Sequence, residues 1–157
     1  MRIALGADEP YPVHATLADL LRRRGHEVVP FGAIVADPDG PSEAPFVDVA
    51  EAVAREVASG RCDQAVLLCW TGTGVAIAAN KVPGIRAALC TDAQTAAGAR
   101  VWNDANVLCL SNRLLSGDVA AEILAGWFEP GALQPGDPAR GAGGVAALVA
   151  LDARYRG

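Results

Sequence analysis

Short apolar runs alternate with amphipathic segments along this chain, and this alternation limits its possible folds more than any other feature. Five apolar runs have the length and continuity of buried strands, at residues 2–7, 27–32, 64–70, 85–90 and 106–111. Five segments with helical spacing follow them, at residues 14–25, 46–60, 74–81, 92–102 and 116–128. Strands that are apolar on both faces and alternate with helices are typical of a parallel sheet. The pattern therefore predicts a three-layer α/β/α sandwich with a five-stranded, mainly parallel sheet.

The remaining segments suggest how this single domain is completed. The length of 157 residues suits one domain with a sizeable core. Residues 33–45 are rich in Pro, Asp and Gly and are expected to form a surface loop, whereas residues 129–144 resemble an exposed linker. The apolar helix expected at residues 145–155 must pack on its own domain or on a partner subunit. Gly25 and Gly60 lie where helices of this kind end in a glycine cap.

Composition excludes several classes of partner. The net charge is −5 and the pI is about 4.9, which argues against nucleic acid or an anionic membrane. No run approaches the roughly 20 apolar residues that span a bilayer, so we expect a cytoplasmic protein. The four cysteines are expected to be free thiols, since none forms a CxxC pair. With only His14 and His26 available, a zinc site would be hard to assemble.

The stretch "VLLCWTGTGVAIAANK" contains the strongest candidate for a functional site. Cys69 ends the third expected strand, and Thr71 to Gly74 form a turn into a helix. Ligands of parallel sheets bind beyond the carboxyl ends of the strands, and a glycine-rich helix start favours negative charge. Three interpretations remain open: a buried structural cysteine, a weak G-x-G dinucleotide turn, or a thiolate base beside an oxyanion site. A P-loop is excluded because no G-K-[ST] follows.

Longer motifs narrow this choice. The segments "CWTGTGVAIAANKVPGIRAALC" and "RVWNDANVLCLSNR", with "GADE" and "FVDVAEAVAREV", resemble the ribose-5-phosphate isomerase B / galactose-6-phosphate isomerase (LacAB) family. The likeness covers about residues 1–150, and its most specific block runs from Cys69 to Arg113. It implies a Rossmann-like fold and interconversion of aldose and ketose phosphates through a cis-enediolate, without a metal or cofactor.

The resemblance also implies roles for individual residues. Cys69 matches the family's base, and Thr71 matches the hydroxyl that helps move a proton between the two substrate oxygens. A free thiol is mostly protonated at neutral pH, so the helix start would have to favour the thiolate. The remaining matches are an oxyanion hole formed by the amides of Gly72, Thr73 and Gly74, sugar contacts from Asp8 and Asn103, and a phosphate contact from Arg113.

Several residues near these motifs also have plain structural interpretations. Asn80 and Lys81 are expected to cap and pack the end of a helix. Arg86 and Arg100 are interpreted as ordinary charges at the ends of elements. Asp104 and Asn106 are expected to build the turn before the fifth strand.

This chain departs from the family pattern around the predicted site. Glu9 replaces a histidine that contacts phosphate, and Trp102 replaces a histidine to which the family's ring opening is attributed. Trp70 replaces the glycine after the cysteine, and residues 45–47 replace the family's D-Y-P. Arg140 matches one of two phosphate-clamping arginines, whereas Gly144 occupies the place of the other. We therefore count Glu9, Trp70, Trp102 and Arg140 among the expected substrate-binding residues, since the two indoles offer flat surfaces for stacking on a sugar.

The prediction from sequence is an aldose–ketose isomerase, first of all for ribose 5-phosphate and ribulose 5-phosphate. Its alternatives are an isomerase for another sugar or a non-phosphorylated sugar or sugar acid, and a non-catalytic sugar-binding protein with the same fold. The family likeness also implies a homodimer or homotetramer with active sites at the subunit interface. The linker and the apolar last helix are consistent with that assembly.

Overall fold

The structure is a computed structural model that describes residues 1–35, 43–133, 136 and 139–155. The strands are β1 (Arg2–Ala7), β2 (Glu27–Gly32), β3 (Gln64–Cys69), β4 (Ala87–Leu89) and β5 (Val107–Ser111). The helices are α1 (Pro12–Arg23), α2 (Phe46–Ala58), α3 (Thr73–Ala79), α4 (Ala93–Asn103), α5 (Gly117–Phe128) and α6 (Ala139–Arg154), with a 3₁₀ helix η1 at Pro130–Leu133.

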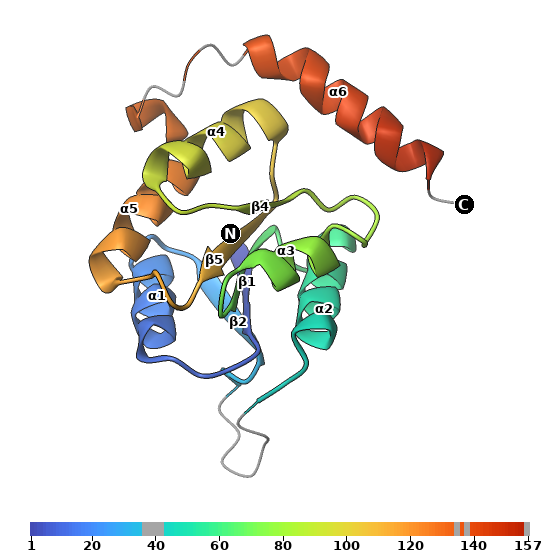
Figure 1. The fold of residues 1–157 in the computed structure, drawn as a ribbon. Helices are drawn as coiled ribbons and strands as arrows, with labels where there is room; N and C mark the ends of the chain where they lie inside the picture. The colour runs from blue at the N-terminus through green and yellow to red at the C-terminus, as the bar shows by residue number, and fades with distance from the viewer. Residues whose placement is uncertain (36–42, 134–135, 137–138, 156–157) are drawn as a thin grey trace.

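The five strands form one sheet in the order β2-β1-β3-β5-β4, and every pairing is parallel. Helices α1, α4 and α5 cover one face of the sheet, and α2 and α3 cover the other (Figure 1). The predicted three-layer α/β sandwich is therefore confirmed. Because β1 and β3 are neighbours whose chains continue toward opposite edges of the sheet, their carboxyl ends form the kind of crevice where such folds bind ligands.

Burial of alternate side chains explains why the three central strands form the core. In β3, Leu68 joins the cluster beneath α1, α4 and α5, whereas Leu67 and Cys69 join the cluster beneath α2 and α3. Each fully buried leucine contributes about 1.5–3 kcal/mol relative to an exposed one. The same alternation places the Cys69 side chain on the α2 and α3 side.

Local signals set where helices begin and end. Asp92 caps α4 by accepting the Thr95 N–H at 2.8 Å, and Ser116 caps α5 in the same way. Gly25 and Gly60 have φ values of 80° and 74°, so the predicted glycine ends of the first two helices are confirmed.

The C-terminal segment differs from the expectation. Residues 130–133 form η1, and α6 begins at Ala139, six residues before the expected 145. Glycines and prolines made this segment resemble a linker, but Gly141 lets the helix lie against α4. A Cβ at Gly141 would stand 2.7 Å from the Trp102 Cα and the Val101 carbonyl oxygen. Residues 36–42 of the expected loop and 134–135 and 137–138 of the expected linker lie outside the described residues.

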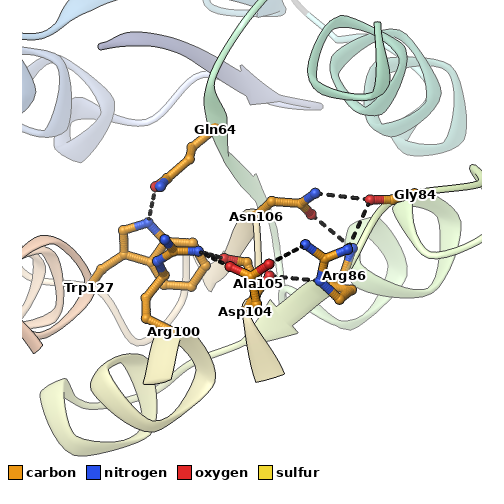
Figure 2. A network of polar contacts seen from close by, with 8 residues as sticks. All are labelled: Gln64, Gly84, Arg86, Arg100, Asp104, Ala105, Asn106 and Trp127. Atoms are coloured by element: carbon orange, nitrogen blue, oxygen red, sulfur yellow. Dashed lines mark hydrogen bonds and ion pairs between the residues drawn. The ribbon is translucent and has the colours of Figure 1, made fainter. Parts of the chain in front are cut away.

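A polar network fixes the amino-terminal edge of the sheet (Figure 2). The Arg86 guanidinium donates to the Asp104 carbonyl oxygen at 2.7 Å and to its carboxylate at 2.8 Å. Asn106 accepts the Arg86 N–H at 2.8 Å, and Arg100 donates to the Ala105 carbonyl oxygen. Asp104 adopts φ 47°, which a short polar side chain tolerates.

The expected turn before β5 is therefore confirmed. The interpretation of Arg86 and Arg100 as structural charges at the ends of elements is confirmed, and both tie this turn to its neighbours.

Asn80 has the structural role expected of it. It is the C-cap of α3, and its side-chain amide both donates to the Ala87 carbonyl oxygen at 2.8 Å and accepts the Ala87 N–H at 2.9 Å. The amide thereby pairs with a backbone edge of β4 that no strand covers within the described chain.

Nowhere in the described ranges is a helix both long and apolar enough to cross a membrane.

Candidate active site

Cys69 is the last residue of β3 and lies at the carboxyl edge of the sheet with 6% of its surface exposed. Its Sγ atom accepts the backbone N–H of Gly72 at 3.2 Å. The thiol is therefore held against the turn that starts α3. Such a donor stabilises negative charge on sulfur more than it stabilises a neutral thiol.

Gly72 can bend this turn because it lacks a side chain. Its φ of 76° lies in the left-handed region, where a Cβ is strained. A Cβ there would also stand 2.6 Å from Leu89 Cδ1 and 2.8 Å from the Leu110 carbonyl group. Both conformation and space therefore require glycine at the position that contacts the thiol.

One of the three amides expected in the oxyanion hole, that of Gly72, already has a hydrogen-bond partner in this structure. The Gly72 N–H donates to the Cys69 sulfur, and a role for this amide in an oxyanion hole stays a prediction. Thr73 and Gly74 open α3, so their backbone N–H groups have no partner within the helix. The hydroxyl oxygens of Thr71 and Thr73 are 2.6 Å apart and both residues are exposed, so one of these hydroxyls donates to the other.

The loop after β1 brings the predicted sugar contacts to the same edge. The Tyr11 hydroxyl donates to the Glu9 carboxylate at 3.1 Å, and the Tyr11 ring lies 6.3 Å from the Trp70 ring. Asp8 has one buried carboxylate oxygen with no hydrogen-bond partner among the described residues. Burial is the main reason that the pKa of Asp8 is raised above its usual range, and the neighbouring Glu9 raises it further.

The loop after β5 is attached directly to the strand that carries the thiol. The Asn112 N–H donates to the Cys69 carbonyl oxygen at 3.0 Å, and the Arg113 N–H donates to that of Trp70 at 3.3 Å. The Ser111 hydroxyl donates to the same Trp70 carbonyl at 2.9 Å. Arg113 is exposed next to this junction, as a phosphate contact would have to be.

Sequence reasoning missed three polar residues at this edge. Tyr11 orients Glu9, whereas His14 and Asn112 join each other by a 2.8 Å hydrogen bond although they are 98 residues apart in sequence. Their signal was available in part, because each lies just beyond the carboxyl end of a buried strand. Their pairing was not available, since it depends on the order of the strands.

Three expected substrate-binding residues do not lie with Cys69 in one chain. Trp102 and Asn103 end α4 at the opposite, amino-terminal edge of the sheet, near Asn106, whose carbonyl group pairs with β3 at its start. The Trp102 side chain packs against Gly98 and Gly136, and its backbone packs against Gly141, the residue after Arg140. Roles for Trp102, Asn103 and Arg140 in binding substrate stay predictions, and they require a second subunit.

The three cysteines other than Cys69 are weakly acidic thiols. Burial raises the pKa of Cys62, raises the pKa of Cys90 to about 12, and raises that of Cys109 as well. All four cysteines are free. Across the described ranges, no three His, Cys, Asp or Glu side chains gather as a metal site would need.

Comparison with known proteins identifies the family of this chain. Residues 3–140 match the Ribose/Galactose Isomerase family (LacAB_rpiB). The chain is 37% identical to the D-erythrulose-4-phosphate isomerase of Pectobacterium atrosepticum over 130 residues, which are 82% of this chain and 83% of that protein. It is 35% identical to ribose-5-phosphate isomerase B of Escherichia coli over 129 residues, 81% of this chain and 83% of that protein. The solved structure of Clostridium thermocellum ribose-5-phosphate isomerase B has a TM-score of 0.81 and 38% identity, with 99% of each chain covered. The resemblance seen in the motifs is thus confirmed, and the chain belongs to the ribose/galactose isomerase family of sugar-phosphate isomerases.

Proposed function

We propose that this protein is an aldose–ketose isomerase in which Cys69 moves a proton between C1 and C2 of a sugar phosphate. The observation that carries the proposal is the 3.2 Å hydrogen bond from the Gly72 N–H to the Cys69 sulfur at the carboxyl edge of the sheet. It joins a nucleophilic side chain to a glycine turn that no other residue type fits.

In the proposed reaction the Cys69 thiolate removes the proton on the carbon next to the substrate carbonyl. The electrons of that C–H bond form a cis-enediolate, whose oxygen accepts hydrogen bonds from the free amides of Thr73 and Gly74. The Thr71 hydroxyl passes a proton between the two oxygens, and the Cys69 thiol then returns its proton to the neighbouring carbon. Stabilising the enediolate oxygen is what makes removal of such a weakly acidic proton feasible. No step uses a metal, so we expect activity to persist after chelation.

The rim of the site supports a substrate with one anionic end and one hydroxylated end. Arg113, whose backbone is tied to that of Trp70, is proposed as the cation for the anionic end, whereas Glu9, oriented by Tyr11, is an acceptor for hydroxyl groups. The exposed Trp70 ring offers an apolar surface for the carbon skeleton. Ribose 5-phosphate, the substrate named for the Escherichia coli and Clostridium thermocellum relatives, meets these requirements.

A four-carbon sugar phosphate is a second candidate, favoured by Trp102. An indole cannot exchange protons to open a sugar ring, which is the role that the family resemblance implies for a histidine at this position. A tetrose phosphorylated on its terminal oxygen has no hydroxyl left to close a ring, so it needs no ring opening. The Pectobacterium atrosepticum relative is named for a substrate of this type.

The active site is proposed to be completed by a second subunit. Trp102, Asn103 and Arg140 lie away from Cys69 in one chain, and α6 exposes Leu148, Val149 and Leu151 beside a groove of about 710 Å³. Apolar side chains of this kind favour burial against another copy of the chain. Sedimentation of the wild-type protein as a single chain would contradict this assembly.

A substrate panel tests the proposed function. Ribose 5-phosphate, D-erythrulose 4-phosphate and free ribose are assayed with the wild-type protein and with Arg113→Ala. We expect turnover of a phosphorylated sugar, and a loss in kcat/KM of about 10–100-fold in Arg113→Ala, because a charge-assisted phosphate contact contributes about 1.5–3 kcal/mol. Higher kcat/KM for the tetrose phosphate would assign the second substrate. Absence of turnover on every sugar would contradict the proposal and favour a non-catalytic sugar-binding protein.

A further inference from the structure

His14 lies in the first turn of α1 with 4% of its surface exposed, and both of its ring nitrogens have partners. Nδ1 lies 3.2 Å from the Tyr11 backbone nitrogen, whose N–H it accepts, and Nε2 lies 2.8 Å from the Asn112 side-chain oxygen. Because Nδ1 is an acceptor here, the proton of the neutral ring is on Nε2, which donates it to Asn112. Burial lowers the pKa of His14, in agreement with a neutral ring.

This hydrogen bond connects the two loops that flank the thiol. α1 follows β1, Asn112 follows β5, and β3 lies between these strands in the sheet. The backbone of Asn112 is tied to the Cys69 carbonyl oxygen, so its side-chain bond to His14 reaches across the end of β3. The loop carrying Asp8, Glu9 and Tyr11 is thereby fixed relative to the loop carrying Arg113.

The bond also fixes the orientation of the Asn112 amide. Since the oxygen is held by His14, the amide nitrogen is left as a buried donor without a partner among the described residues. Asp8, which interacts electrostatically with His14, also has a buried carboxylate oxygen without a partner among the described residues. A hydroxyl group can accept a hydrogen bond from such an amide and donate one to such a carboxylate. Asn112 is 7% exposed and borders a hollow of about 370 Å³ between the starts of α1 and α5.

We propose that His14 is a positioning residue of the isomerase, which holds the Asn112 amide with its N–H groups free for a substrate hydroxyl and sets the spacing of the two substrate-binding loops. This inference rests on the proposed function and adds two residues to its site. His14 acts through Asn112 and does not itself exchange protons with the substrate.

Conservative variants separate positioning from packing. His14→Gln can place an amide N–H near the position of Nε2, His14→Asn can keep only the acceptor for Tyr11, and His14→Leu keeps neither. We expect His14→Leu and His14→Asn to raise KM about tenfold, which is 1.4 kcal/mol, with a smaller change in kcat. His14→Gln is expected to retain a KM near that of the wild type. In an Asn112→Ala background, His14→Leu should raise KM little further.

His26→Leu is the matched control, since His26 is a partly buried histidine just before β2, at the amino-terminal edge of the sheet, whose ring nitrogens have no hydrogen-bond partners among the described residues. It should leave KM unchanged. The inference is overturned if His14→Leu also leaves KM unchanged, or if His14→Gln is as impaired as His14→Leu. Should His14→Leu fail to fold, the KM values of His14→Gln and His14→Asn test the positioning role. The tautomer of His14 is then measured by ¹⁵N NMR of the wild-type imidazoles. A protonated Nε2 is expected, and a protonated Nδ1 would overturn the assignment.

Failure of the proposed isomerase function can be distinguished from failure of the positioning role of His14. If the wild-type protein turns over no sugar phosphate, the isomerase assignment fails. The same variants are then compared by calorimetry for their Kd with ribitol 5-phosphate, a polyol that cannot isomerise. A tenfold weaker Kd in His14→Leu, restored in His14→Gln, supports the positioning role, and equal Kd values reject it.

Discussion

At the scale of single residues, the geometry of the candidate site depends on Gly72, although this residue has no side chain. Its left-handed conformation and the close approach of Leu110 are both consequences of turning β3 into α3 within a few residues. The same conformation brings its N–H to the Cys69 sulfur. The backbone conformation that only glycine adopts easily is therefore also the one that forms the hydrogen bond to the proposed base.

Gly72→Ala should destabilise the fold and abolish turnover. We expect a loss of about 3 kcal/mol, from left-handed strain and from contact with the Leu110 backbone, which corresponds to a Tm lower by about 6–12 °C. Gly60→Ala is the matched control, since Gly60 has a φ of 74° but no atom lies within 4 Å of the place that an added methyl group would take. Thermal unfolding of both variants is the measurement. Equal effects in the two would show that the space around Gly72 is not restricted.

At the scale of secondary structure elements, α6 shows how glycine can build a helix contact as well as end a helix. The sequence indicated a linker through residue 144 because it contains several glycines and prolines. The structure instead begins α6 at Ala139 and uses Gly141 for close approach to α4. Propensity favours a loop here, and tertiary packing overrides it.

Two substitutions in α6 should have opposite effects. Gly141→Ala would place a methyl group 2.7 Å from the Trp102 Cα, so it should displace α6 and lower Tm. Gly143→Ala meets nothing within 4 Å and should raise stability by up to about 1 kcal/mol through helix propensity. Thermal unfolding and limited proteolysis measure how firmly α6 packs on α4, and sedimentation measures assembly. If both variants behaved alike, the proposed contact between α6 and α4 would be wrong.

At the scale of the whole molecule, the lowered pKa values of His14 and His26 make stability depend on pH. Burial lowers the pKa of His14 and His26, while the unfolded chain keeps a histidine pKa of about 6.5. Between the folded and unfolded values the unfolded chain binds more protons, so stability rises with pH there. The contribution is complete above about pH 6.5 and is lost as the pH falls. Asp8 acts in the opposite direction and at lower pH, since its pKa is raised.

We expect the free energy of unfolding in urea to be larger at pH 7.5 than at pH 5.5. The double variant with His14→Gln and His26→Leu should show a smaller difference, because it lacks both histidines. Comparing the two proteins removes the effect of net charge, which changes equally in both apart from the histidines. Identical pH dependence in the two proteins would assign the effect to other groups.

The sequence was sufficient for the sheet, most helices and the thiol turn, because these are encoded locally by apolar periodicity and by the CWTGTG motif. It was insufficient wherever strand order decides. His14 and Asn112 meet only because β3 lies between β1 and β5, and Trp102 lies far from Cys69 only because α4 runs back to the other edge. The contact of the Gly72 amide with the sulfur likewise depends on a backbone angle that no pattern of residues specifies.

The central claim is that Cys69 is the base of an isomerase. The most direct test compares kcat for Cys69→Ala with that for Cys62→Ala, which removes a buried thiol at the far edge of the sheet, using the best sugar phosphate of the panel. We predict a fall of about 10²–10⁴-fold for Cys69→Ala, since this is the contribution of a positioned base, and a kcat near that of the wild type for Cys62→Ala. A folded Cys69→Ala protein that turns over substrate as fast as the wild type would contradict the account.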